Sequence, residues 1–141
     1  MSHVSYLIGR WAGDGEFHNA GGSHPFTQTE TVSAHLGGEL LTIEGIGWDR
    51  GDTSRRIHAA MAVMSYERER YLWRAYSAGL WTDTELHLLP QGFSWALHPA
   101  PGVVIRYTAV IDGSTWEEVG EMAHGGAPWS TIMSMRLGRQ E

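Results

Sequence analysis

The segment LIGRWAGDGEF, residues 7–17, places Gly9, Trp11, Gly13 and Gly15 on alternate positions near the start of the chain. Such a run could be a phosphate-binding loop, the opening strand of a β-barrel, or a cluster of turns. Glycine within a strand permits a bend or the close approach of another backbone, and tryptophan supplies a large apolar surface to bury. Composition and the pattern of the remaining segments decide between these interpretations.

Composition excludes several classes of chemistry. The chain has 141 residues, so we expect residues 1–141 to form one domain with its own hydrophobic core. It contains no cysteine, which excludes disulfides, thiolate metal ligands and a cysteine nucleophile. All ten basic residues are arginine. The absence of lysine excludes Schiff-base catalysis and a phosphate-binding loop of the Walker type.

The charge balance narrows the choice of partners. Ten arginines stand against sixteen acidic residues, which gives a formal net charge of −6. A net acidic chain without a basic run does not suit a nucleic-acid backbone or an anionic membrane. No apolar stretch is long enough to cross a bilayer, and the beginning MSHVSYLIGR lacks the basic-then-apolar order of a signal peptide. We therefore expect a cytoplasmic protein without nucleic acid or membrane as a partner.

Segments with β-branched, aromatic or alternating character recur along the whole chain, each closed by a turn signal such as NAGG, LGG, DRGD or PAPG. This rhythm is typical of an all-β sandwich or barrel. Nearly all connections are too short for parallel crossovers, and about ten strands in an antiparallel meander curl or close. The sequence therefore predicts an all-β, roughly ten-stranded antiparallel up-and-down barrel. The expected strands are 10–18, 25–35, 39–48, 56–66, 70–78, 80–89, 92–98, 103–111, 115–124 and 129–137.

Two short stretches leave room for helix. The run AAMAVMSYERER, residues 59–70, contains helix formers, although its apolar residues fit alternation as well. The first residues, SHVSYLI, could form a short helical turn that plugs one end of the barrel.

Strand alternation assigns side chains to the inner or outer face of the barrel. In the segment 92–98 it predicts that Phe93, Trp95 and Leu97 lie inside. The same reasoning places these residues inside: Leu41, Ile43, Ile57, Ala59, Met61, Val63, Val103, Ile105, Tyr107, Ala109, Trp116, Met122, His124, Trp129, Thr131, Met133, Met135 and Leu137. Glu118 shares the face of Trp116, and the strand 70–78 is ambiguous.

A barrel of this width can be filled by side chains or can hold one small molecule. Aromatic and methionine side chains with a few polar groups are the usual lining of a small-molecule pocket, but the same stripe also makes an ordinary core. The predicted ligand-binding residues are Met61, Tyr76, Trp95, Tyr107, Met122, His124, Trp129 and Met133.

The opening segment, with Gly9-x-Trp11 followed by Gly13 and Gly15, resembles that of the calycin superfamily, and its extended form looks most like nitrobindin-type bacterial barrels. The stretch HLGGELL, residues 35–41, is similar to the Gly-Gly-x-Phe/Leu-Leu stretch of that group. The resemblance covers the two ends and the strand rhythm, while the middle matches only in pattern. It implies a lipocalin-like barrel.

The resemblance also implies a structural floor. In calycins the tryptophan closes one end, and a basic residue of the last strand packs across its ring in a cation–π contact. The counterparts here are Gly9, Trp11 and Arg139, because Arg139 has the parity of the inward stripe, with Arg136 as the alternative if a bulge shifts the phase.

Nitrobindins bind haem through a histidine near the C-terminus, whereas WSTIMSMRLGRQE, residues 129–141, contains none. His124, on the preceding strand, is the nearest candidate. The eight histidines form no local metal-binding pattern. We therefore expect no metal and no cofactor, with haem as the exception to test.

Three functions remain open for the lumen: a carrier or sensor of a small hydrophobic or aromatic molecule, a cyclase or isomerase that positions such a substrate, and a haem protein. There is no Gly-x-Ser-x-Gly nucleophile elbow. Acidic pairs such as Glu117 with Glu118, and Asp83 with Glu85, could do acid–base work, but an acidic face on a barrel is usually only solvated. A homodimer is compatible with the sequence.

Overall fold

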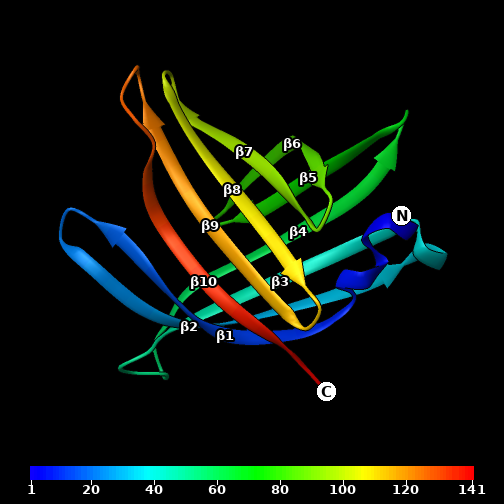
Figure 1. The fold of residues 1–141 in the computed structure, drawn as a ribbon, viewed down its shortest axis with the longest axis horizontal. Coiled ribbons are helices and arrows are strands. Elements are labelled where there is room, and N and C mark those ends of the chain that lie inside the picture. Colours follow the sequence, from blue (N-terminus) through cyan, green and yellow to red (C-terminus); the bar gives the residue numbers. More distant parts are fainter.

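The computed structural model, which describes residues 1–141, confirms the all-β fold (Figure 1). Ten antiparallel strands close into one barrel, in which each strand pairs with its neighbours in the chain and the first pairs with the last. The strands are β1 (Gly9–Asn19), β2 (Gly22–His35), β3 (Leu40–Asp49), β4 (Arg56–Glu67), β5 (Arg70–Ser77), β6 (Leu80–Leu89), β7 (Gly92–Ala100), β8 (Val103–Asp112), β9 (Thr115–His124) and β10 (Ser130–Gln140).

Helical structure is confined to two 3₁₀ turns, η1 (Ser2–Leu7) and η2 (Leu36–Gly38). The first is the predicted N-terminal turn, and its Val4 and Leu7 are completely buried. The helical alternative for residues 59–70 is wrong, because most of that stretch lies in β4 and β5. No helix in the structure has the length and apolar character needed to span a bilayer.

The glycines of the opening segment let β1 pass very close to β10. A Cβ atom at Gly13 would overlap the carbonyl oxygen of Arg136, and one at Gly15 would overlap that of Ser134. Any larger residue at these two positions would push the strands apart, so the glycine alternation is a steric requirement of the tightly coiled wall. The segment is therefore a barrel strand and not a phosphate-binding loop.

One tightly packed part of the core lies at the end that η1 covers. Here Trp11 and Trp116 meet edge to face with ring centroids 5.4 Å apart, and Phe93 packs on Trp116 at 5.9 Å. All three rings are at most 1% exposed. This end of the barrel is filled by side chains.

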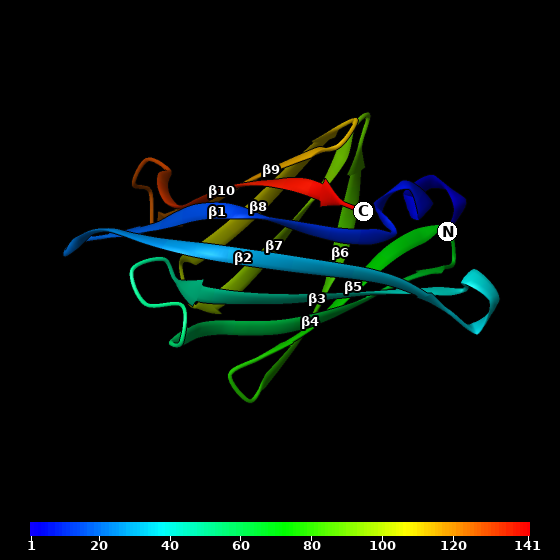
Figure 2. The same ribbon diagram turned by 90° about the horizontal axis from the view of Figure 1, so that it is seen from below.

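Toward the other end the wall is not continuous. Strands β6 and β7 pair only where residues 87–89 meet residues 92–94, so the rest of the two strands is not joined. In Figure 2 the hairpin between β5 and β6 projects away from β7 and β8. The barrel is closed at its floor and splayed toward its mouth.

Alternation gave the wrong face for β4. Ile57 was expected inside but is 37% exposed, whereas Ala62 and Met64 are buried. The strand carries apolar side chains on both faces, which removes the contrast on which the assignment depends. In β5 the ambiguity resolves with Trp73 inside.

Candidate functional site

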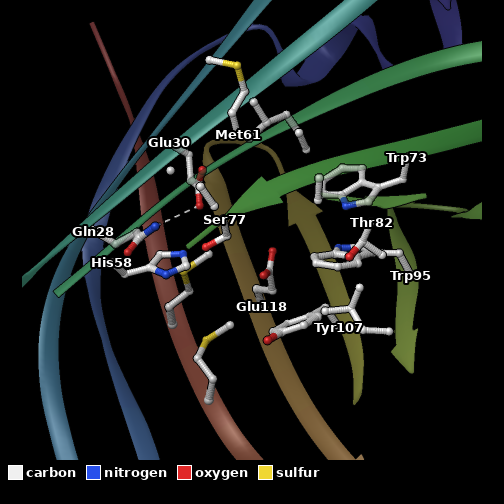
Figure 3. A pocket seen from close by; sticks show the side chains of 18 of the residues that line it. Gln28, Glu30, His58, Met61, Trp73, Ser77, Thr82, Trp95, Tyr107 and Glu118 are labelled. Atoms are coloured by element: carbon white, nitrogen blue, oxygen red, sulfur yellow. Dashed lines mark hydrogen bonds between the residues drawn. The ribbon is translucent and has the colours of Figure 1, made fainter. Parts of the chain in front are cut away.

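The open half of the barrel encloses a cavity of about 450 Å³ (Figure 3). Sixteen of its 25 lining residues are hydrophobic. Its volume lies within the range of about 300–1,000 Å³ that small-molecule sites occupy. The lumen is thus large enough for one small organic molecule.

One wall of the cavity is a stack of aromatic rings drawn from three strands. Trp73 of β5 lies 4.8 Å from Trp95 of β7, with 28° between the ring planes. Trp95 in turn lies 4.6 Å from Tyr107 of β8, at 22°. Gly120 leaves space for the last ring, because a Cβ there would lie 2.9 Å from a Tyr107 ring carbon. These nearly parallel rings form a column with Trp95 in the middle, and the column is an apolar aromatic wall that an aromatic molecule can pack against.

Two carboxyl groups also line the cavity, Glu30 of β2 and Glu118 of β9, each only 9% exposed. Glu30 accepts a hydrogen bond from the Gln28 amide at 3.1 Å, and Glu118 accepts one from the Trp116 indole at 3.2 Å. Figure 3 shows Glu118 between Glu30 and Tyr107. Both acids therefore face the space that the aromatic wall faces.

Two glycines of β3 make room for these polar side chains. Gly45 is the register partner of Glu30 and Gly47 is the partner of Gln28. A Cβ at Gly45 would lie 2.6 Å from Glu30 Oε2, and one at Gly47 would lie 2.5 Å from Gln28 Oε1. The glycines let the Gln28 and Glu30 side chains lie across the neighbouring strand, inside the barrel.

Burial changes the acidity of both carboxyls. It raises the pKa of Glu30 to about 8, with a further contribution from the neighbouring Glu118, while the Gln28 hydrogen bond opposes the rise. It raises the pKa of Glu118 to about 7, opposed by the Trp116 hydrogen bond. Each carboxylate disfavours ionisation of the other, so the two acids titrate as a pair near neutral pH.

The cavity also contains two histidines, His58 of β4 and His98 of β7. The His58 ring lies 6.5 Å from Phe17 in an edge-to-face arrangement. Burial lowers the pKa of His58, which favours the neutral ring at pH 7. No three histidine or acidic side chains cluster in a way that could hold a metal ion.

Four of the eight predicted ligand-binding residues line the cavity: Met61, Trp95, Tyr107 and Met133. The other four, Tyr76, Met122, His124 and Trp129, do not. Tyr76 is 51% exposed and lies beside Trp81 on the outer surface. Met122 and His124 belong to the end of β9, where His124 is exposed.

The placement of Trp129 shows why its assignment was wrong. The register of β10 against β9 shifts between Thr131 and Met133, and a bulge reverses the inside–outside alternation that precedes it. Trp129 is 41% exposed and is covered by Arg106, whose guanidinium carbon lies 4.1 Å from the ring centroid. Trp129 is thus a surface residue.

Sequence reasoning missed Gln28 and Glu30 altogether, and it placed Glu118 on the inner face but paired it with Glu117 for acid–base work rather than with Glu30. A signal was present, since residues 25–35 put Gln28 and Glu30 on the same face as Phe26 and Val32. Polar residues within an otherwise apolar inner face, opposite glycines on the next strand, indicate a polar site inside the barrel.

The floor is built from Gly9, Trp11 and Arg139. The Arg139 guanidinium carbon lies 4.2 Å from the Trp11 ring centroid, and the guanidinium donates hydrogen bonds to the carbonyls of Tyr6 and Ile8 at 2.6 and 2.8 Å. The Trp11 indole donates to Leu7 at 3.0 Å. Gly9 has φ +137°.

The alternative floor residue, Arg136, lies elsewhere. It forms an ion pair with Glu117 at 3.1 Å, and both side chains are mostly exposed. The final strand therefore turns only Arg139 toward Trp11.

Two solved structures share this architecture. The Rv2717c protein of M. tuberculosis is 17% identical, with a TM-score of 0.76 over 99% of this chain and 96% of that one. The S-type phycobiliprotein lyase CPES of Guillardia theta is 10% identical, with a TM-score of 0.69 over 99% and 92% of the two chains. No described protein family and no curated protein matches the sequence. The fold and its cavity define a calycin-like, lipocalin-like barrel with an open lumen.

Proposed function

We propose that this barrel binds a small, largely aromatic molecule in its lumen. The observation that carries the proposal is the cavity of about 450 Å³ with the stacked wall of Trp73, Trp95 and Tyr107. An apolar cavity with a few inward polar groups is the usual form of a small-molecule site. The likeness to a phycobiliprotein lyase supports a lumen that serves ligand chemistry.

The splayed region between β6 and β7 supplies the access route. Leu80 and Thr82 line the cavity from β6, and Leu97, His98 and Pro99 line it from β7. These strands are not paired at this level, so a ligand can pass between them without breaking backbone hydrogen bonds of the sheet.

Titration with the neutral fluorophore N-phenyl-1-naphthylamine tests the proposal. We expect saturable binding, weakened about fivefold by Trp95→Leu, because one aromatic contact contributes about 1 kcal/mol. Trp81→Leu is the matched control, since Trp81 lies outside the cavity and is 54% exposed. Equal affinities for the two variants, or no saturable binding, would contradict a lumenal site. Native mass spectrometry of the purified protein then identifies any co-purified ligand.

An enzyme is the second candidate, and the carboxyl pair favours it. A general acid or base works best with a pKa near the operating pH, and Glu30 and Glu118 have pKa values of about 8 and about 7. An isomerase or cyclase would use the stacked wall to position its substrate and this pair to move a proton. Conversion of the co-purified ligand, abolished by Glu118→Gln while ligand binding persists, would favour the enzyme.

Haem of the nitrobindin type fits this lumen less well. The lining histidines are His58 and His98, and neither lies near the C-terminus, where nitrobindins carry their ligand. The lining contains no arginine and two acids, which disfavours an anionic porphyrin. We therefore propose an organic ligand without iron. A Soret shift with a one-to-one endpoint on haem titration would overturn this choice.

A further inference from the structure

We propose that the lumen selects an aromatic molecule that carries a basic nitrogen, and that the protonated nitrogen binds between Glu30 and Glu118. The inference rests on the proposed function, because it names the class of ligand for the same cavity. It assigns the carboxyl pair the role of recognising a cation.

The first argument is charge. Glu30 and Glu118 face one cavity, and no arginine is among its lining residues. The other titratable groups that line it are His58 on β4, His98 on β7 and Tyr107 on β8. Burial lowers the pKa of His58 and raises that of Tyr107, so both are neutral at pH 7. A buried carboxylate is stable only when a cation or several donors accompany it, and no arginine or lysine lines this cavity.

The second argument is unused hydrogen-bonding capacity. Each carboxyl has one protein donor, Gln28 for Glu30 and Trp116 for Glu118, and in both cases the donor binds Oε1. An ionised carboxylate can accept about four hydrogen bonds. The Oε2 atoms have no hydrogen-bond partner, so a protonated amine or amidine, with two or three N–H groups, would fill the remaining positions on both acids.

An independent observation concerns Trp73, which is 5% exposed. Its indole nitrogen is a buried donor with no acceptor, and the residue lines the same cavity. Buried donors in native proteins almost always have a partner. An acceptor atom on the aromatic part of a ligand would satisfy this N–H after the small side-chain adjustment that binding commonly brings. The orphaned donor indicates that the cavity is completed by a bound molecule.

The arrangement fits one ligand shape. Figure 3 shows Glu118 beside the column of Trp95 and Tyr107 rings, and Glu30 beyond Glu118. An aromatic ring that packs against this column would lie next to the two acids. A nitrogen attached directly to the ring, or one carbon removed from it, would therefore reach the acids. A metal ion is a poorer occupant, since no third acid or histidine joins the pair.

Three naphthalenes of similar size test the inference: 1-naphthylmethylamine, 1-naphthalenemethanol and 1-naphthoic acid, titrated by calorimetry at pH 8.5. Charge-assisted hydrogen bonds are worth about 1.5–3 kcal/mol. We therefore expect the amine to bind at least about tenfold more tightly than the alcohol, and the acid to bind most weakly. The amine-to-alcohol preference should rise from pH 6 to pH 8.5, because the two carboxyls ionise in this range while the amine stays protonated.

Variants assign the effect to the pair. Glu118→Gln and Glu30→Gln should each bring the affinities of amine and alcohol close to equality. Glu117→Gln is the matched control, because Glu117 is the neighbour of Glu118 on the outer face of β9 and pairs with Arg136. It should leave the preference as it is in the wild type.

The outcomes separate the two proposals. If the alcohol binds as tightly as the amine, or the acid binds most tightly, the cation site is wrong while the lumenal site stands. If none of the three naphthalenes binds, the proposed function itself fails. The comparison of ligands uses the wild-type protein, so it decides even where a variant does not fold.

Discussion

The two ends of this barrel are built from the same kinds of residue, but their buried polar groups differ in how completely they are hydrogen-bonded. At the floor, the Trp11 indole has its acceptor and the Arg139 guanidinium has two. In the open half, the Trp73 indole has no acceptor, and two buried acids share one largely apolar cavity. At the floor the polar groups are hydrogen-bonded within the protein, whereas the open half has polar groups to which a ligand can bind.

The packing of the aromatic rings differs between the two ends in the same way. Rings packed edge to face around Trp11 close one end, and nearly parallel rings with free space beside them line the other. Because the barrel wall is continuous only at the floor, the open half can adapt to a ligand without loosening the closed end.

The largest expected effect is at the floor. Trp11→Ala should lower the free energy of unfolding by roughly 3–5 kcal/mol, because it removes a fully buried indole from a packed core. Urea denaturation followed by circular dichroism measures it. Trp81→Ala, on the outer surface, should cost less than about 1 kcal/mol. A similar small loss for Trp11→Ala would mean that the indole does not close the floor.

The next largest expected effect is a gain in stability from replacing Glu118 in the open half. The unfolded pKa of a glutamate is about 4.3, and that of folded Glu118 is about 7, so the folded state binds the proton more tightly. The contribution of Glu118 to the stability is therefore full below pH 4, falls as the pH rises toward 7, and is lost above it.

Glu118→Gln removes this loss. The variant should be more stable than the wild type at pH 8, and its advantage at pH 8 should exceed that at pH 5 by on the order of 2–3 kcal/mol. Thermal and urea unfolding at the two pH values measure the difference, with Glu117→Gln as the exposed control. A pH-independent difference between variant and wild type would show that the carboxyl ionises normally.

A smaller loss should follow from Arg139→Leu, which removes the cation–π contact with Trp11 and the hydrogen bonds to Tyr6 and Ile8. We expect about 1–2 kcal/mol, the sum of one partly exposed cation–π contact and two modest hydrogen bonds. Arg136→Leu removes only an exposed ion pair and should change stability by less than about 0.5 kcal/mol. Equal losses for the two variants would place the structural arginine at neither position.

The smallest expected effect tests which tyrosine, Tyr107 or Tyr76, faces the lumen. Tyr107→Phe should change the stability by less than about 1 kcal/mol while altering the affinity for the naphthalene probes, because Tyr107 lines the cavity. Tyr76→Phe should alter neither quantity, since Tyr76 lies outside. A change in probe affinity for Tyr76→Phe alone would reverse the assignment of the two faces in β5 and β8.

Much of the fold was predictable because local signals agree with it. Strand alternation in residues 103–111 and 92–98 correctly placed Ala109 and Phe93 inside. Short turns required antiparallel neighbours, and ten such strands require closure. Prediction failed where one strand is apolar on both faces, as around Ile57, and where a bulge shifts the phase, as at Trp129.

The candidate site was only half predictable. Trp95, Tyr107 and Met133 follow from alternation, whereas the pairing of Glu30 with Glu118 does not, because these acids come from strands far apart in the chain. Only closure of the barrel between β1 and β10 brings β2 and β9 to the same side of the lumen.

By itself, the sequence determined the barrel and the glycine spacing of its first strand, since both depend on local alternation and on steric limits along one chain. Tertiary structure alone decided that the wall opens between β6 and β7 and that two acids share one apolar cavity. The physical reason is that desolvation raises the pKa of Glu118 to about 7, and desolvation with the charge of Glu118 raises that of Glu30 to about 8. Neither effect exists before the chain closes.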